Sequence, residues 1–331
     1  MRAEGEAVKY RILVIGKMDQ AGLKALGSAP DVVLTKVDHL DAQQLLEQIH
    51  DYEGVIIRSG TNINRNVIEA ASRLKVIGRA GVGVDNIDLD AASEKGILVL
   101  NAPNAITAST AEHTLALMLA ASRLIVRAHN SLLEGNWSRA AFKGRQLSGK
   151  ELGIIGFGRI GRAVSVRAFA FGMNNYFFDP YVSSEIGSRY KAEKLAFESL
   201  LERADYISLH AASTPETRNM VDRGAFSKMK PGVIFVNVSR GALVDEIALI
   251  EALNSGKVRA AALDVFREEP PVHNPLIGME NVIHTPHLGA STMEAQKDTA
   301  LEIAGVVLDA LRGTALKNVV NRQSSVGDHS S

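Results

Sequence analysis

The sequence predicts an α/β protein made of two Rossmann-like or flavodoxin-like domains, each a doubly wound parallel sheet. Short apolar runs alternate with amphipathic segments along most of the chain, as in parallel strands covered by helices on both faces. The length of 331 residues exceeds what one ordinary hydrophobic core needs. A glycine-rich turn directly follows one apolar run near the middle of the chain, where the second domain is expected to begin.

The first domain is predicted from regular alternation between residues 10 and 100. Its expected strands are Arg11–Ile15, Val32–Val37, Gly54–Ile57, Lys75–Ile77 and Ile97–Leu100. Helices are expected in the gaps, among them Ala42–Ile49, Arg65–Ala71 and Leu89–Lys95. No glycine fingerprint follows the first of these strands, which distinguishes this domain from the second.

The connection to the second domain begins with a turn at residues 101–104 and an apolar segment, Ala108–Leu133, rich in Ala, Leu and Met. We expect one long helix here, buried between the domains or at a subunit interface. The following loop, residues 135–147, carries Trp137, Arg139 and Lys143.

Near its end the chain is expected to return to the first domain. An amphipathic helix at about Thr292–Leu311 is expected to fold back on it, and the polar tail Arg322–Ser331 is expected to be disordered. The predicted domains are therefore 1–104 with 289–331, and 105–288. A ligand site is expected in the cleft that faces the carboxyl ends of both sheets.

The second domain opens with the strand Leu152–Ile155 and the fingerprint Gly156-Phe157-Gly158-Arg159-Ile160-Gly161. The first glycine permits a tight turn, the second lets a pyrophosphate approach the backbone, and the third lets the helix pack on the strand. The phosphates are expected on the free N–H groups at the start of that helix.

An acidic residue ends the next strand and indicates the cofactor. Tyr176–Phe178 runs into Asp179, which lies 179 − 161 = 18 residues beyond the last glycine. A carboxylate at about this distance accepts hydrogen bonds from the ribose hydroxyls of the dinucleotide. Because it also repels a 2′-phosphate, the sequence predicts NAD rather than NADP.

Three later strands each end in residues suited to acid–base chemistry. The strands expected after Asp179 are Tyr206–Leu209, Val233–Val238, Ala260–Val265 and Val282–His284. Arg240, Glu269 and His287 follow the last three in turn. Because parallel strands bring their carboxyl ends to one edge, we expect these side chains beside the nicotinamide.

These three residue types match the transfer of hydride from an alcohol. A histidine that titrates near neutrality can take the hydroxyl proton and return it in the reverse direction. A carboxylate fixes the tautomer of that imidazole. An arginine can bind a substrate carboxylate and polarise the adjacent carbonyl.

The composition excludes several other classes of function. Lys+Arg and Asp+Glu are both 37 and no basic cluster stands out, which argues against a nucleic-acid partner. The absence of cysteine excludes disulfides and thiolate sites, and no metal is predicted. The amino terminus lacks a signal-peptide core, and no apolar run reaches the roughly 18 residues that span a bilayer. We expect a cytoplasmic protein without a membrane partner.

A set of motifs spread over residues 12–320 carries a resemblance to a known family. They read Ile56-Ile57-Arg58-Ser59-Gly60-Thr61, Gly78-Arg79-Ala80-Gly81-Val82-Gly83-Val84-Asp85-Asn86-Ile87-Asp88, Asn101-Ala102-Pro103-Asn104, the glycine fingerprint, Asn237-Val238-Ser239-Arg240-Gly241, Ala261-Ala262-Leu263-Asp264-Val265-Phe266 and Thr285-Pro286-His287-Leu288-Gly289-Ala290. With these motifs the chain resembles the D-isomer-specific 2-hydroxyacid dehydrogenase family, and within it the members that act on 3-phosphoglycerate.

The resemblance implies a role for each matching position. Arg240 would bind the substrate, His287 would be the acid/base, and Glu269 would be its partner. Cofactor contacts are implied for Gly156, Gly158, Arg159, Ile160, Gly161, Asp179, His210, Val238, Ser239, Arg240, Asp264, His287, Gly289 and Ala290, although a histidine such as His210 is more often a capping or packing residue. Substrate contacts are implied for Arg58, Ser59, Gly60, Arg79, Gly81, Val82 and Gly83. Arg58, Arg79, Arg139 and Lys143 are the candidates for a substrate phosphate.

The implied reaction is hydride transfer between NAD and a D-2-hydroxy acid. The leading pair is 3-phosphoglycerate and 3-phosphohydroxypyruvate, in the first step of serine biosynthesis. Glyoxylate, hydroxypyruvate, a lactate-like acid and sulfolactate are the alternatives. A homodimer or a dimer of dimers is expected. A dinucleotide-sensing corepressor scaffold on the same fold is the non-enzymatic alternative, and the complete Arg-Glu-His set disfavours it.

The sequence departs from the family pattern at two positions. Ala212 stands where the family has proline, which is expected to loosen the loop beside the cofactor. Val82 stands where members that act on 3-phosphoglycerate often have threonine. The chain is also expected to lack the serine-binding regulatory domains of longer members, and therefore serine feedback inhibition.

Overall fold

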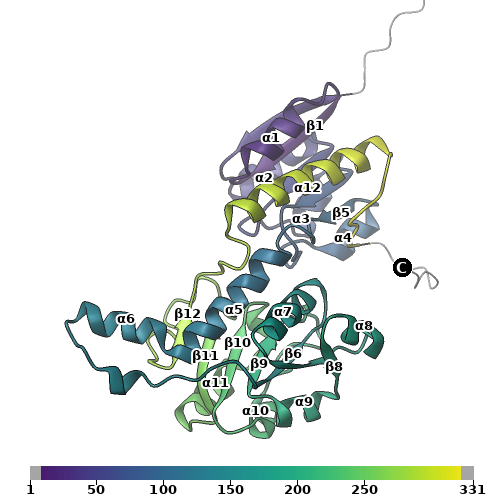
Figure 1. Cartoon of the computed structure of the whole chain (residues 1–331). Coiled ribbons are helices and arrows are strands. Elements are labelled where there is room, and N and C mark those ends of the chain that lie inside the picture. Colours follow the sequence, from purple (N-terminus) through teal and green to yellow (C-terminus); the bar gives the residue numbers. More distant parts are fainter. Residues whose placement is uncertain (1–8, 322–331) are drawn as a thin grey trace, which may run out of the picture. The chain divides into compact units, whose positions relative to one another are not determined.

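The computed structural model describes residues 9–321, which form two compact units (Figure 1). The first comprises the described residues up to Ile106 and from Thr292 onward, and the second is Thr107–Ser291. Each contains a sheet whose paired strands are all parallel, which confirms the predicted fold class. The tail that we expected to be disordered lies outside the described residues.

The first unit has a five-stranded sheet in the order β2-β1-β3-β4-β5. Its strands are β1 (Tyr10–Ile15), β2 (Val32–Val37), β3 (Gly54–Ile57), β4 (Val76–Arg79) and β5 (Leu98–Asn101). Its helices are α1 (Gln20–Gly27), α2 (Ala42–Gln48), α3 (Arg65–Ala70), α4 (Leu89–Glu94) and α12 (Met293–Arg312), with a 3-10 turn η1 (Ile49–Asp51). Alternate strand residues face opposite sides. Leu13 and Val55 pack with α2, α3 and α4, whereas Val14 and Ile56 pack with α1 and α12.

Helix α12 covers the second face of this sheet together with α1. It lies against α1 (Figure 1). Its Ile303 and Val307 are completely buried. Glycines allow this approach, because a Cβ on Gly22 would lie 2.6 Å from the Ala300 carbonyl oxygen. A Cβ on Gly78 of β4 would lie 2.6 Å from a methyl carbon of Val307. The unit is therefore completed by a segment far from it in sequence.

The second unit has a seven-stranded sheet in the order β12-β11-β10-β9-β6-β7-β8. Its strands are β6 (Glu151–Ile155), β7 (Asn174–Phe178), β8 (Ala192–Lys194), β9 (Tyr206–Leu209), β10 (Val233–Asn237), β11 (Val258–Leu263) and β12 (Val282–His284). Its helices are α5 (Thr107–Arg123), α6 (Ile125–Leu133), α7 (Arg159–Ala170), α8 (Ser184–Arg189), α9 (Phe197–Arg203), α10 (Arg223–Lys228) and α11 (Glu246–Asn254), with 3-10 turns η2 (Arg139–Phe142) and η3 (Gly241–Leu243). Helices α5 and α7 cover one face, and α9, α10 and α11 cover the other.

The strand order indicates which edge of this sheet is expected to bind a ligand. The chain passes from β6 to β7 on one side, and β9 pairs with β6 on the other. Ligands of such sheets bind at this reversal, outside the carboxyl ends of the strands. The turn after β6 is the glycine fingerprint, so the motif lies at that edge.

The prediction of one helix over Ala108–Leu133 is wrong. Leu124 adopts a left-handed conformation (φ 55°) and separates α5 from α6. The cause is tertiary: the backbone N–H of Arg145 donates to the carbonyl of Ser122 at 2.8 Å. Gly144 crosses there so closely that a Cβ would lie 2.6 Å from the same oxygen. Helix α5 is largely buried, whereas α6 buries no side chain among the described residues and projects from the unit (Figure 1).

Candidate functional site

The three glycines of the fingerprint have different surroundings in the structure. Gly156 has φ 89°, and a Cβ there would lie 2.4 Å from the backbone nitrogen of Ala211. A Cβ on Gly161 would lie 2.3 Å from the carbonyl oxygen of Gly156. Gly158 precedes α7, and no atom of the described chain lies within 4 Å of where its Cβ would be. Two glycines are therefore required by packing, and the third leaves open space at the helix N-terminus.

That open space fits a dinucleotide phosphate. The first N–H groups of a helix lack intrahelical partners, so those of Arg159, Ile160 and Gly161 at the start of α7 are available for an anion. Because Gly158 has no side chain, a phosphate can approach the backbone itself. The residues present thus fit the group that the sequence predicts.

Asp179, directly after β7, forms a hydrogen bond with the glycine turn. One carboxylate oxygen accepts from the backbone N–H of Phe157 at 2.8 Å, and the other accepts from that of Tyr181 at 2.9 Å. Each carboxylate oxygen can accept a second hydrogen bond. The side chain can therefore hold the glycine turn and accept from ribose hydroxyls at once.

His210 directly follows β9, and its backbone lies against Gly156 of the glycine turn. Its imidazole is neutral. Burial lowers the pKa of His210 to about 3, and its Nε2 lies 2.8 Å from the hydroxyl of Ser208. The loop beyond it, where Ala212 replaces proline, is held by two hydroxyls. Ser239 donates to the Ala211 carbonyl at 2.6 Å, and Thr217 donates to the Ala212 carbonyl at 2.7 Å.

Arg240 lies on a tight turn after β10. The side-chain amide of Asn237 donates to the Arg240 carbonyl at 2.9 Å and accepts from the backbone N–H of Ser239 at 3.0 Å. The next residue, Gly241, packs so closely on the loop after β11 that a Cβ would lie 1.9 Å from the Phe266 carbonyl carbon. The loops carrying Arg240 and Glu269 are thereby fixed against each other.

Glu269 and His287, from the loops after β11 and β12, form a direct hydrogen bond. His287 Nδ1 lies 2.7 Å from Glu269 Oε2, and Glu269 Oε1 accepts from the backbone N–H of Phe266 at 3.2 Å. Burial raises the pKa of Glu269, but the hydrogen bond and charge of His287, the Phe266 N–H and the charge of Arg240 together lower it. The ionised carboxylate only accepts, so Nδ1 carries the proton and Nε2 is left for chemistry.

The loop that carries His287 is anchored on a buried carboxylate. Asp264 accepts from the Thr285 hydroxyl at 2.5 Å and from the backbone N–H groups of Leu288 and Gly289 at 2.7 and 2.8 Å. Its side chain has no exposed surface. Nε2 of His113 on α5 lies 3.2 Å from the same carboxylate.

His113 and Thr285 were not among the residues that we expected at the site. A signal existed for His113, because Ser109, Thr110 and His113 lie close together on a helix that buries much of its surface. Polar side chains on a buried helix face need partners, so such a group indicates a hydrogen-bonded neighbour.

In the first unit, the predicted substrate residues lie on loops that follow β3 and β4. The side-chain amide of Asn86 donates to the carbonyls of Arg58 and Thr61 at 3.1 and 2.5 Å, and that of Asn101 donates to the Val82 carbonyl at 2.8 Å. The backbone N–H groups of Ser59, Gly60, Val82 and Gly83 have no acceptor among the described residues. These loops therefore present unused donors that suit a carboxylate.

The candidate phosphate-binding cations lie in different settings. The guanidinium of Arg79 folds back and donates to the Ala80 carbonyl at 3.0 Å, and that of Arg58 donates to the Lys17 carbonyl at 3.1 Å. Arg139 and Lys143 are exposed, on and just after η2. Within the described chain, neither of them forms a hydrogen bond or an ion pair with Glu269 or His287.

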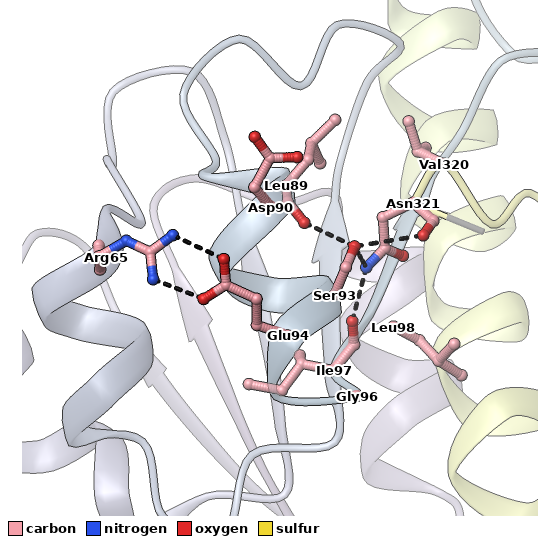
Figure 2. A pocket seen from close by; sticks show the side chains of 10 residues that line it. All are labelled: Arg65, Leu89, Asp90, Ser93, Glu94, Gly96, Ile97, Leu98, Val320 and Asn321. Atoms are coloured by element: carbon pink, nitrogen blue, oxygen red, sulfur yellow. Dashed lines mark hydrogen bonds and ion pairs between the residues drawn. The ribbon is translucent and has the colours of Figure 1, made fainter. Parts of the chain in front are cut away.

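A hollow in the first unit lies apart from all the predicted site residues. It has a volume of about 860 Å³ and is lined by residues of α3, α4 and β5 together with Val320 and Asn321 (Figure 2). Arg65 pairs with Glu94 across one part of it, and Asn321 bonds to Ser93 in another (Figure 2). Much of its polar lining is thus occupied by contacts within the unit.

Residues 9–321 lack two other features that would indicate a function. They contain no group of three or more His, Asp or Glu side chains that could hold a metal ion. They also contain no helix with the length and apolar character needed to cross a membrane.

Comparison with known proteins gives consistent matches. Residues 115–289 match the profile of the "D-isomer specific 2-hydroxyacid dehydrogenase, NAD binding domain". The D-3-phosphoglycerate dehydrogenase of Methanocaldococcus jannaschii is 50% identical over 94% of this chain and 59% of its own length. That of Bacillus subtilis is 41% identical over 96% of this chain and 60% of its own length. The chain thus spans about three-fifths of the length of these relatives.

Solved structures match over nearly their whole length. A glyoxylate reductase from Paecilomyes thermophila has a TM-score of 0.87 and 33% identity, covering 94% of this chain and 98% of its own. A D-lactate dehydrogenase from Aquifex aeolicus, complexed with NAD and lactic acid, has a TM-score of 0.82 and 28% identity, covering 92% and 96%.

Proposed function

This chain belongs to the D-isomer specific 2-hydroxyacid dehydrogenase family, and we propose that it transfers hydride between NAD(H) and a D-2-hydroxy acid/2-oxo acid pair. The proposed pair is 3-phosphoglycerate and 3-phosphohydroxypyruvate, the first step of serine biosynthesis. The hydrogen bond between His287 and Glu269, in a unit with an NAD-binding profile, carries the proposed chemistry. The names of relatives up to 50% identical support the proposed substrate.

In the proposed mechanism, His287 moves the proton. Bound NAD supplies the hydride acceptor. Nε2 of His287 takes the proton of the substrate hydroxyl, and the adjacent carboxylate of Glu269 stabilises the imidazolium that forms. Arg240 binds the substrate carboxylate and polarises the carbonyl that develops. In the reverse direction the same Nε2 returns the proton.

The proposed substrate contacts come from both units. We propose that the unused N–H groups of Ser59, Gly60, Val82 and Gly83 in the first unit bind the substrate carboxylate. Arg58 and Arg79 of the first unit and Arg139 and Lys143 of the second are the proposed cations for the phosphate. The second unit would also hold NAD and the proton-transfer pair.

We further propose that the chain pairs with a second copy through α6 and the residue Trp137, in the cytoplasm. Leu132, Leu133 and Trp137 are 54%, 75% and 79% exposed. Large apolar side chains exposed together on and beside a projecting helix are typical of a protein interface. Such an interface places Arg139 and Lys143, which follow directly in sequence, beside the second copy.

The proposed function is tested by NADH oxidation with 3-phosphohydroxypyruvate, hydroxypyruvate, glyoxylate and pyruvate side by side. We expect kcat/KM to favour the phosphorylated acid at least about tenfold, or roughly 1.4 kcal/mol of transition-state binding. His287→Ala, which should bind NADH normally and lose most turnover, is the control for the active site. Preference for glyoxylate or pyruvate would overturn the phosphate assignment, and no turnover of any acid would overturn the enzymatic proposal.

A further inference from the structure

We propose that His113 is a positioning residue that holds the loop carrying His287, a segment defined here as the His287 loop (residues 285–289). The inference rests on the proposed function of His287, because it says what keeps that side chain in place. His113 lies on α5, far from the loop in sequence, and belongs to the same unit.

Side chains on one face of α5 form hydrogen bonds with both ends of the His287 loop. The hydroxyls of Ser109 and Thr110 donate to the Gly289 carbonyl at 2.7 and 3.2 Å. Nε2 of His113 lies 3.1 Å from the Thr285 hydroxyl. Residues four apart share a helix face, so Ser109 and His113 reach the end and the start of the loop from one surface. The helix therefore acts as a rigid support for a short irregular segment.

The tautomer of His113 follows from its partners. The Asp264 carboxylate is ionised: burial raises its pKa, but hydrogen bonds from His113, Thr285 and the N–H groups of Leu288 and Gly289 together lower it. Thr285 uses its only hydroxyl proton on that carboxylate. An unprotonated Nε2 would place its lone pair against the anion at 3.2 Å. Nε2 of His113 must therefore carry a proton, which it donates to Asp264.

The His287 loop depends on this anchor. His287 adopts a left-handed conformation (φ 56°), which non-glycine residues keep only where their surroundings hold them. Its backbone N–H donates to the carbonyls of Asp264 and Thr285 at 2.9 and 3.0 Å. Asp264 and Thr285 are the two residues that His113 contacts. Loss of the His113 donor leaves a buried anion with one partner fewer and releases the start of the loop.

His113 acts through this loop and not on the reacting atoms. Nε2 of His113 contacts Asp264 and Thr285, and Asp264 in turn accepts a hydrogen bond from the backbone of the His287 loop. The phosphate-binding turn and Asp179 lie on other elements, after β6 and β7. Removal of the His113 donor should therefore reduce turnover by a larger factor than it weakens the binding of NADH.

The test compares His113→Leu, which removes the donor, with His113→Gln, whose side-chain amide can donate from nearly the same place. Each variant is assayed for kcat with the best oxo acid and for the Kd of NADH by fluorescence. Hydrogen exchange at the amides of Leu288 and Gly289 is measured without substrate. His39→Leu, at an exposed position in the first unit, is the matched control.

For His113→Leu we expect kcat to fall about tenfold or more, the range that a small misplacement of a catalytic group produces. The Kd of NADH should rise by a smaller factor than kcat falls, amide exchange at 288 and 289 should accelerate, and His113→Gln should recover most of the kcat. Unchanged exchange in His113→Leu would overturn the proposal, as would a loss confined to NADH affinity. If the wild-type protein turns over no oxo acid, the proposed function fails, and the exchange experiment still decides the role of His113.

Discussion

At the scale of single residues, two carboxylates of the second unit each hold a loop in place. Asp179 accepts backbone hydrogen bonds on both sides of its own position, and Asp264 accepts four hydrogen bonds, two of them from backbone amides. Hydrogen bonds to an ionised acceptor are stronger than those between neutral groups. Substitution of either carboxylate should therefore affect both the local backbone and the chemistry.

Asp179→Ala should raise the tolerance of NADP. The ratio of kcat/KM with NADPH to that with NADH is expected to rise about tenfold or more, because the charge that repels a 2′-phosphate is gone. NADH itself should bind more weakly, since the Phe157 N–H loses its acceptor. Initial rates with both cofactors measure this, with the exposed Asp38→Ala as control. An unchanged ratio would show that Asp179 does not select the cofactor.

Asp264→Asn should change how stability depends on pH. The pKa of Asp264 is lowered in the folded state, so its contribution to stability is present above the unfolded-state pKa of about 3.9 and is lost as pH falls through the lower folded value. The asparagine variant should be less stable at pH 7 by about 1–3 kcal/mol, because buried N–H donors lose acceptors. Its Tm should also fall less steeply than that of the wild type below about pH 4. Parallel Tm curves between pH 3 and 7 would contradict this.

At the scale of elements, local pattern predicted most of the architecture. Apolar periodicity predicted eleven strands of the two sheets, and the missed strand β8 has only three residues, two of them charged. The helix break at Leu124 could not be predicted, because neither glycine nor proline marks it and a distant segment causes it. That Glu269 and His287 lie close together could be predicted from the strand ends that they follow, because the topology brings the carboxyl ends of parallel strands to one edge. The contact of His113 with Asp264 depends on how a helix packs on the sheet, which local sequence does not encode.

Substitution of two glycines in the turn between β6 and α7 is expected to affect different properties, stability at Gly156 and NADH affinity at Gly158. Gly156→Ala should destabilise the protein by roughly 1–3 kcal/mol or more, because φ is positive and a Cβ would collide with backbone atoms. Gly158→Ala meets no atom of the described chain, so Tm should be nearly unchanged while the Kd of NADH rises. Thermal unfolding and NADH titration of both variants separate fold from ligand effects. Equal losses of stability would contradict the assignment of Gly158 to the phosphate.

At the scale of the whole molecule, the three residues proposed for substrate binding and proton transfer belong to one unit. Arg240, Glu269 and His287 follow β10, β11 and β12, which are neighbours in a single sheet. Their mutual geometry is therefore set within the second unit. The loops proposed to bind the substrate carboxylate belong to the first unit, so substitutions there can change the choice of acid while the proposed proton chemistry is kept.

The proposed pairing through α6 has a built-in reporter, because Trp137 is the only tryptophan in the sequence. It is 79% exposed in the single chain, so association should bury it and shift its emission to shorter wavelength as protein concentration rises. Leu133→Asp should keep the protein monomeric and its emission at longer wavelength. A dimer detected by sedimentation without any change in emission would place the interface elsewhere.

Helix α12 has a consequence for synthesis on the ribosome. The first five strands emerge early, but one face of their sheet is covered by Ile303, Ala304 and Val307, which come after the whole second unit. That unit has 291 − 106 = 185 residues, and at 5–20 residues per second its translation takes on the order of 10–40 s. During that time Val14, Ile56 and their neighbours have the cover of α1 but lack that of α12. The second unit can therefore complete its fold before the first.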